Sequence, residues 1–196
     1  MKLIIATGNQ GKLKEFRNLL SGLFEEVTSL GDLGLEQTAE ETGETFAENA
    51  WIKARSVAEK FPACAVLADD SGLSVDALHG EPGVYSARYS AEGTDAANRK
   101  KLLQAMQGQP NRSAHFTSVL VLILPDGRVL QAEGTVQGRI LEEETGAEGF
   151  GYDCLFYCDE LKKSFGQATR EEKNAVSHRG RAMRRLQILL RDALQK

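Results

Sequence analysis

Two adjacent aspartates are the residues of this sequence best placed for chemistry on phosphates. Asp69 and Asp70 follow a short apolar run, and carboxylate oxygens are ligands that Mg²⁺ accepts beside waters and substrate phosphates. Either residue could also accept a proton from an attacking water. Asp70 with Glu41 or Glu40, from the acidic stretch 31–44, could form the metal site. The alternative is that the aspartates are turn residues at the end of a strand.

A glycine-containing turn near the N-terminus offers a second part of such a site. Backbone N–H groups, a helix N-terminus and a cation are what a triphosphate needs from a protein. The turn supplies all three and reads Thr7, Gly8, Asn9, Gln10, Gly11 and Lys12. It matches neither G-x-x-x-x-G-K-[ST] nor G-x-G-x-x-G, so a P-loop kinase or a Rossmann dehydrogenase is not indicated. A plain connection between a strand and a helix is the alternative.

Aromatic and basic residues in the last third of the chain could bind a purine base. The loop 149–153 carries Phe150, Tyr152 and Asp153, and a donor-rich segment follows with Lys173, Ser177, His178, Arg179 and Arg181. A purine stacks on an aromatic ring. Hypoxanthine and xanthine present carbonyl acceptors where adenine has an amino donor, so a donor-lined pocket favours deaminated bases. The alternative is that both rings pack in the core and the basic run begins a solvated helix. Without a G-x-S-x-G motif, His178 is not indicated as a triad histidine.

Hydrophobic periodicity predicts the elements that position these residues. Strands are expected at 3–6, 64–68, 114–124 and 128–136, the last two joined by a turn at 125–127. Helices are expected at 12–20, from the capping box at 45–48 to Pro62, at 94–107 and at the C-terminus. An ordered loop is expected at 80–92. The terminal helix should bury a stripe at 183, 186, 189, 190 and 194. The order of elements predicts an α/β fold: a mixed β-sheet with helices on both faces.

Composition limits the class of protein. The chain has 196 residues and a formal net charge of −4, which suits a single domain over residues 1–196, with two lobes around a cleft. The acidic balance argues against a protein that coats nucleic acid or an anionic membrane. No apolar run is long enough for a membrane span, and no signal peptide is recognisable. Cys64, Cys154 and Cys158 form no C-x-x-C pair, which favours a reducing cytoplasm.

Six motifs in a fixed order resemble the non-canonical purine nucleoside triphosphate pyrophosphatases, also called inosine triphosphate or dITP/XTP pyrophosphatases. The resemblance covers nearly the whole chain. The motifs are Thr7-Gly8-Asn9-x-x-Lys12, Thr45-Phe46-x-Glu48-Asn49-Ala50, Ala68-Asp69-Asp70-Ser71-Gly72-Leu73, Pro82-Gly83-Val84-Tyr85-Ser86-Ala87-Arg88, Gly149-Phe150-Gly151-Tyr152-Asp153 and Glu172-Lys173-Asn174-Ala175-Val176-Ser177-His178-Arg179-Gly180.

The resemblance implies a homodimer of elongated α/β subunits with a central cleft, which uses Mg²⁺ to cleave ITP, dITP and XTP between the α- and β-phosphates and so cleanses the nucleotide pool. It implies that Asp70 is the catalytic proton acceptor and a metal ligand together with Glu41. The turn from Thr7 to Lys12 would hold the phosphates. The nucleotide would also contact Ser71, Phe150, Gly151, Tyr152, Asp153, Lys173, His178 and Arg179. No nucleic acid or membrane partner is implied.

One position departs from the family pattern: Cys154 stands where proline usually follows Gly-Tyr-Asp, and proline would stiffen the loop by fixing φ. Three other functions fit the sequence less well. A septum-type (Maf-like) pyrophosphatase would carry a Ser/Arg-rich opening loop in place of Thr7-Gly8-Asn9. A non-catalytic nucleotide sensor would need no acid at the metal position. An RNA-binding module would show exposed basic stripes.

Overall fold

The chain divides into two compact units. The computed structural model describes residues 1–20, 22–35 and 39–195. The first unit comprises Met1–Asp70, Val119–Glu133 and Ala182–Lys196, and the second comprises Ser71–Ser118 and Gly134–Arg181. The single domain with two lobes around a cleft, expected from the sequence, stays a prediction.

Strands of the described residues form a mixed sheet, as the sequence predicts. Its order is β2-β1-β3-β4-β5-β6-β7. β1 pairs in parallel with β2 and β3, and β6 pairs antiparallel with β5 and β7. The bounds are β1 Lys2–Ile5, β2 Glu26–Ser29, β3 Ala65–Val75, β4 Ser113–Ile123, β5 Val129–Ile140, β6 Phe156–Cys158 and β7 Lys163–Ser164. The short strands β2, β6 and β7 were not predicted from hydrophobic periodicity.

Helices begin where the sequence provides side chains that cap them. The bounds are α1 Gln10–Leu19, α2 Phe46–Ala58, α3 Asp95–Ala105, α4 Arg170–Val176 and α5 His178–Leu194. The capping box predicted at the start of α2 is confirmed, because Thr45 Oγ1 accepts from Glu48 N at 3.2 Å and Glu48 Oε2 accepts from Thr45 N at 3.0 Å. Such caps stabilise a helix by about 1 kcal/mol. The predicted ordered loop at 80–92 contains a 3₁₀ helix, Gly83–Arg88.

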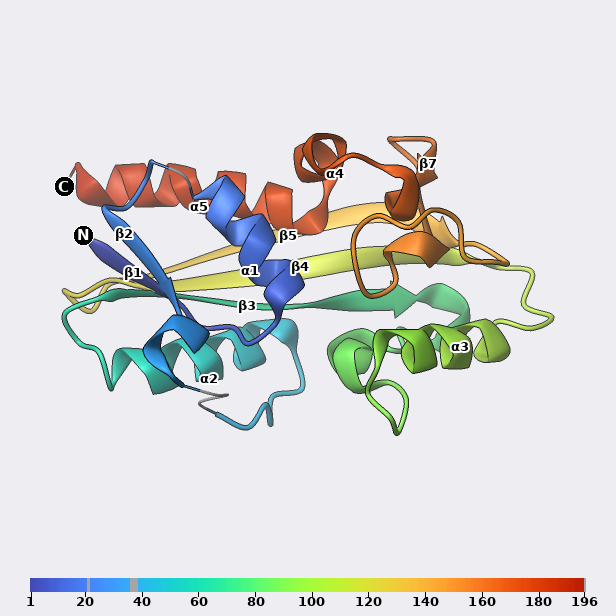
Figure 1. Cartoon of the computed structure of the whole chain (residues 1–196), viewed down its shortest axis with the longest axis horizontal. Coiled ribbons are helices and arrows are strands. Elements are labelled where there is room, and N and C mark those ends of the chain that lie inside the picture. The colour runs from blue at the N-terminus through green and yellow to red at the C-terminus, as the bar shows by residue number, and fades with distance from the viewer. Residues whose placement is uncertain (21, 36–38, 196) are drawn as a thin grey trace. The chain divides into compact units, whose positions relative to one another are not determined.

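Successive side chains of β1 and of the residue after it pack against different helices of the first unit. Leu3 and Ile5 of β1 pack in a cluster with α1 and α5, whereas Ile4 and Ala6 pack in a cluster with α2. Successive side chains of a strand point to opposite faces, so one short strand contributes to both layers. Figure 1 shows α1 and α5 on one side of β1 and β3, with α2 on the other. The prediction of helices on both faces of the sheet is confirmed.

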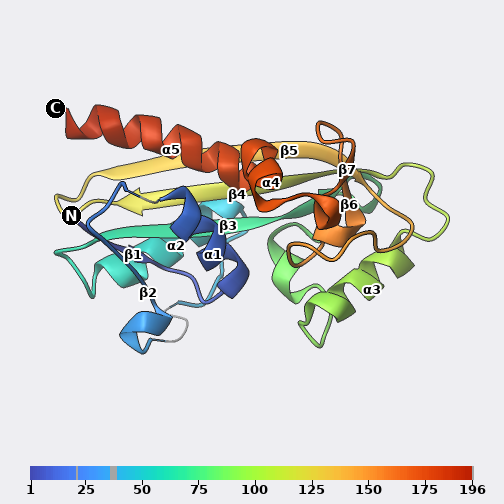
Figure 2. The same cartoon turned by 45° about the horizontal axis from the view of Figure 1, so that its top comes forward.

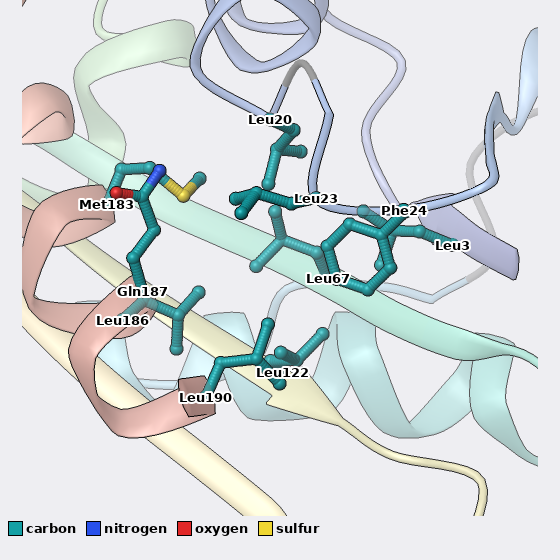
Figure 3. Close-up of a pocket in the computed structure, with 10 residues that line it drawn as sticks. All are labelled: Leu3, Leu20, Leu23, Phe24, Leu67, Leu122, Met183, Leu186, Gln187 and Leu190. Carbon is teal, nitrogen blue, oxygen red and sulfur yellow. The ribbon is translucent and has the colours of Figure 1, made fainter. Parts of the chain in front are cut away.

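Helix α5 packs over an apolar pocket in the first unit. Figure 3 shows the pocket, lined by Leu3, Leu20, Leu23, Phe24, Leu67, Leu122, Met183, Leu186, Gln187 and Leu190. Of the buried stripe predicted for α5, Met183, Leu186 and Leu190 are buried as expected. The prediction is wrong for Leu189 and Leu194, which are 38% and 59% exposed. Leu189 lies about 100° around the helix from Leu190, and Leu194 lies one turn beyond the last buried position.

The second unit has its own aromatic core. Phe116, Phe156 and Phe165 are buried, with Phe116 and Phe156 ring centroids 4.7 Å apart. Leu102 of α3 and Leu73 of β3 belong to the same cluster. This core supports the loop and helix that carry the aromatic and basic residues singled out from the sequence. No helix among residues 1–20, 22–35 and 39–195 has the length and apolar character needed to cross a membrane.

Candidate functional site

The acidic pair lies inside a strand and not after one. β3 was predicted to end at residue 68, but it continues through Asp69 and Asp70 to Val75. The two aspartates are only 2% and 5% exposed. Carboxylates are almost never buried without a partner, and these two are paired with lysines from two different helices. Because the sequence pattern does not reveal partners distant in the chain, the prediction of a strand end at this point was wrong.

The N-terminal turn and the acidic pair meet in the first unit. Lys12 Nζ lies 2.7 Å from Asp69 Oδ2, and both side chains are largely buried. Asn9 is the N-cap of α1, and its side chain accepts from Lys12 N at 3.0 Å. The structure therefore brings together two segments about 60 residues apart in the sequence, as a shared phosphate and metal site requires. Lys12, the cation that the sequence offers to a triphosphate, is therefore already paired with Asp69.

The first turn of α1 retains donors that a phosphate could use. The first N–H groups of a helix have no acceptor within the helix. Of these, Lys12 N–H donates to Asn9, while within the described residues the N–H groups of Gln10 and Gly11 donate to no protein acceptor. A Cβ added to Gly8 would meet nothing within 4 Å, so the backbone there is open. Thr7 Oγ1 accepts from Asn9 N at 3.2 Å and fixes the turn.

Lys53 completes the acidic site and was missed in the sequence. Its Nζ lies 2.8 Å from Asp70 Oδ1 and 3.0 Å from Glu41 Oε1. A signal was present: Lys53 lies three residues after Ala50 and four before Val57, on the buried face of α2. A lysine at a core-facing helix position requires a buried acidic partner. Between the two glutamates left open by the sequence, Glu41 joins this cluster and Glu40 is exposed.

Burial and charge compete at this cluster. Burial raises the pKa of Asp70 above its ordinary value, although Lys53 and Lys12 oppose the rise. Burial alone would lower the pKa of Lys53, but the charges of Asp70 and Glu41 outweigh it, so the pKa of Lys53 is raised and its ammonium stays charged. The cluster thus contains an ionised lysine between two carboxylates, one of which is a stronger base than a solvated aspartate.

The acidic cluster fits a divalent cation held by few protein ligands. Asp70 Oδ2 is buried and has no hydrogen-bond partner in the part of the chain that the structure describes. Among the same residues, no group of three or more His, Cys, Asp or Glu side chains is arranged to hold a metal ion. Mg²⁺ needs only one or two carboxylates when waters and substrate phosphates fill its other positions. Asp70 and Glu41 meet that requirement.

The predicted base-binding residues converge within the second unit. Lys173 Nζ lies 2.6 Å from Asp153 Oδ2, and both side chains are buried. The same ammonium is 4.9 Å from the centre of the Phe150 ring, and Arg179 is 5.7 Å from it. The half-buried Phe150 ring is therefore surrounded by cationic donors, the combination that would stack and hydrogen-bond a purine.

Two further predicted residues belong to this group through the start of α5. Arg179 Nη2 donates to Ser71 Oγ at 2.9 Å. The His178 ring stacks on Phe116, with centroids 4.8 Å apart and planes within 12°. Both residues are almost fully buried, so the alternative of a solvated basic helix start does not hold for them. Ser71 follows Asp70 directly in β3, and this strand therefore carries residues of both groups.

Tyr152 is a core residue, which is the alternative that the sequence left open for the two aromatic rings. It is 5% exposed, belongs to the aromatic core, and its hydroxyl donates to Ser86 O at 2.7 Å. Its side chain thus fastens the loop, while Phe150 is the ring left at the surface of the cluster. Gly151, between them, has φ of +61°, a conformation that favours glycine. The predicted nucleotide contacts of Tyr152 and Gly151 stay predictions.

With this geometry in place, comparison with known proteins assigns the family. The Ham1 family model matches residues 3–188, and the chain belongs to that family. A dITP/XTP pyrophosphatase from Desulfotalea psychrophila is 50% identical over 182 residues, which cover 92% of this chain and 81% of the relative. A dITP/XTP pyrophosphatase from Desulforamulus reducens is 47% identical over 97% of this chain and 96% of its own length.

Solved structures agree with the sequence relatives. The Staphylococcus aureus Ham1 protein superposes with a TM-score of 0.86 at 39% identity, covering 98% of this chain and 100% of the other. A nucleoside-triphosphatase / dITP/XTP pyrophosphatase from Mycobacterium abscessus superposes with a TM-score of 0.75 at 43% identity, covering 95% of this chain and 98% of its own. The fold predicted from the sequence is therefore confirmed over nearly its whole length.

Proposed function

We propose that this chain hydrolyses deaminated purine nucleoside triphosphates, such as ITP, dITP and XTP, to the monophosphate and pyrophosphate, and so cleanses the nucleotide pool. The observation that carries the proposal is the pair of contacts Lys12–Asp69 and Lys53–Asp70. They place a cationic helix start and a basic carboxylate together in a protein of the Ham1 family. Relatives with nearly half of their residues identical are dITP/XTP pyrophosphatases.

Asp70 is the residue assigned to proton transfer. One of its oxygens is held by Lys53, and the other has no partner among the described residues. The two lone pairs of that second oxygen would serve the cation and the attacking water. Asp70 accepts a proton as the water oxygen bonds to the α-phosphorus, and the bond from that phosphorus to the bridging oxygen of the β-phosphate breaks. The raised pKa makes Asp70 a better base, while the two lysines favour its ionised form.

The N-terminal turn receives the leaving pyrophosphate. The N–H groups of Gln10 and Gly11 and the ammonium of Lys12 stabilise the charge that develops on it. Mg²⁺ is the proposed cofactor; when bound it neutralises charge on phosphate oxygens, and Asp70 and Glu41 are the residues that would hold it. Binding phosphates requires Lys12 to share its ammonium between Asp69 and the substrate.

The base is recognised by residues of the second unit. Phe150 provides a ring for stacking, and Lys173, His178 and Arg179 provide donors for the carbonyl oxygens of hypoxanthine or xanthine. Adenine would present an amino donor to these donors and leave buried groups unpaired, which costs about 1–3 kcal/mol for each group. This difference supports selection of deaminated purines.

The remaining proposals concern the setting of the enzyme. The two units act as one pyrophosphatase domain over residues 1–196, the protein works as a homodimer in the cytoplasm, and its partner is a nucleotide and not a nucleic acid. The acidic net charge of −4 supports the last point, because nucleic-acid binding depends on neutralising many phosphates with cations.

A panel of nucleotides tests the proposed function. We expect pyrophosphate release from ITP, dITP and XTP with Mg²⁺, release slower by about tenfold or more from ATP, and none above background after EDTA is added. The rate is measured by a coupled pyrophosphate assay. Equal rates on ATP and ITP would contradict the selectivity, and a faster rate on modified pyrimidine nucleotides would indicate the Maf-like activity.

A further inference from the structure

Two side chains of helix α3 form hydrogen bonds with the backbone N–H and C=O of Gly151, in the base-binding loop. Gly151 N donates to Asp95 Oδ2 at 2.8 Å, and Gly151 O accepts from Arg99 Nη1 at 3.1 Å. Asp95 and Arg99 are four residues apart, so they lie on one face of α3. Figure 2 shows α3 in green beside the orange segment that carries the loop. Neither residue belongs to the motifs that indicated the function.

Arg99 is itself oriented by the chain that leads into the loop. Its Nε donates to Glu144 Oε1 at 2.8 Å, which leaves Nη1 to reach Gly151. Next to Glu144, Thr145 N donates to Cys154 O at 2.8 Å, so both ends of this segment are tied. Hydrogen bonds from α3 and from Thr145 therefore hold this segment at two points.

The held residue lies between two side chains of the base-binding group. Gly151 follows Phe150 and is two residues before Asp153, whose Oδ2 accepts from Phe150 N at 2.9 Å and from Lys173 Nζ at 2.6 Å. A shift of the Gly151 peptide therefore moves the Phe150 ring and loosens the acceptor that fixes Lys173. A second tie on this loop, from Tyr152 to Ser86, does not restrain the Gly151 peptide directly.

We propose that Asp95 and Arg99 are positioning residues for purine recognition: they fix the Gly151 peptide, and through it the Phe150 ring and the Asp153–Lys173 pair, in the orientation that binds a deaminated base. The proposal rests on the proposed function. Neither side chain contacts the base. Their effect is on affinity for the nucleoside part of the substrate, and the phosphate-binding turn of the first unit is independent of them.

The test compares binding of IMP, which contains the base, with binding of pyrophosphate, which does not. We expect Asp95→Ala and Arg99→Ala each to raise the Kd for IMP by about tenfold and to leave the Kd for pyrophosphate unchanged, both measured by titration calorimetry. The KM for ITP should rise by a similar factor, with kcat within about twofold of the wild type. Asp95→Asn retains an acceptor oxygen and should recover most of the affinity for IMP.

The matched controls replace an aspartate and an arginine outside the base-binding group by alanine. Asp126→Ala and Arg55→Ala lose an exposed aspartate and an exposed arginine that pair with residues two and four positions away in the sequence, and both should match the wild type. Thermal unfolding followed by circular dichroism establishes that every variant is folded at the assay temperature. The conservative Arg99→Lys variant, which keeps a single donor nitrogen in place of the two that bind Glu144 and Gly151, serves if Arg99→Ala does not fold.

The outcomes separate this inference from the function on which it rests. Folded Asp95 and Arg99 variants that bind IMP as the wild type does would overturn the positioning role alone. Equal weakening of IMP and pyrophosphate would also overturn it, because the effect would then be a general loss of structure. A wild-type protein that neither binds IMP nor cleaves ITP would overturn the proposed function and the positioning role together.

Discussion

Replacing Asp70 by asparagine is expected to lower kcat for ITP by about 10²- to 10⁴-fold, the usual contribution of a general base. The substitution keeps the size of the side chain and an oxygen that Lys53 can reach, but it removes the group that accepts the proton. Nucleotide binding should survive, since the donors around Phe150 and the first turn of α1 are unchanged. Steady-state pyrophosphate release gives kcat, and calorimetry with ITP gives the Kd.

Asp126→Asn is the matched control for this substitution. Asp126 lies in the turn before β5, where it is exposed and pairs with Arg128, and its loss should leave both constants unchanged. Near-normal turnover by Asp70→Asn would remove Asp70 from the chemistry. Loss of ITP binding equal to the loss of kcat would instead assign Asp70 to binding.

Replacing Lys53 by methionine is expected to make the stability of the protein depend on Mg²⁺. The ammonium lies between two largely buried carboxylates, with side-chain exposures of 12% for Lys53, 7% for Asp70 and 18% for Glu41. Removing one partner of a buried ion pair costs about 3–5 kcal/mol. The Tm without metal should therefore fall. Adding Mg²⁺ should raise the Tm of the variant more than that of the wild type, because a cation then opposes the two uncompensated carboxylates.

Lys60→Met serves as the control, because Lys60 is exposed just beyond the end of α2. Its Tm should equal that of the wild type, with and without Mg²⁺. Calorimetric scans of the wild type and of both variants, each in EDTA and in Mg²⁺, give the Tm values to be compared. An equal Mg²⁺-induced rise in Tm for Lys53→Met and the wild type would contradict a shared location for the lysine and the metal.

Local signals in the sequence were sufficient for the elements whose ends are determined locally. The capping box at Thr45 and Glu48 marks the start of α2, and the Pro125-Asp126-Gly127 turn marks the hairpin of β4 and β5, both as observed. The buried face of the last helix was predicted too wide at Leu189 and one turn too long at Leu194, because periodicity alone does not show where the packing beneath a helix ends.

Residues whose state depends on distant partners were less predictable. From the sequence alone, the polar Asp69-Asp70 pair indicates the end of a strand. It lies inside β3 because the fold brings Lys12 and Lys53 beside the two carboxylates. Lys53 occupies a core-facing helix position that only a buried carboxylate makes favourable. Asp95 and Arg99 carry no motif, and their contact with Gly151 connects parts of the chain more than 50 residues apart.

The most direct test of the proposed reaction is hydrolysis of ITP with Mg²⁺ in oxygen-18-labelled water, followed by mass spectrometry of the products. Attack on the α-phosphorus by a water that Asp70 activates predicts IMP and unlabelled pyrophosphate, with the heavy oxygen in IMP. Formation of IDP and phosphate, or heavy oxygen in pyrophosphate, would contradict that account.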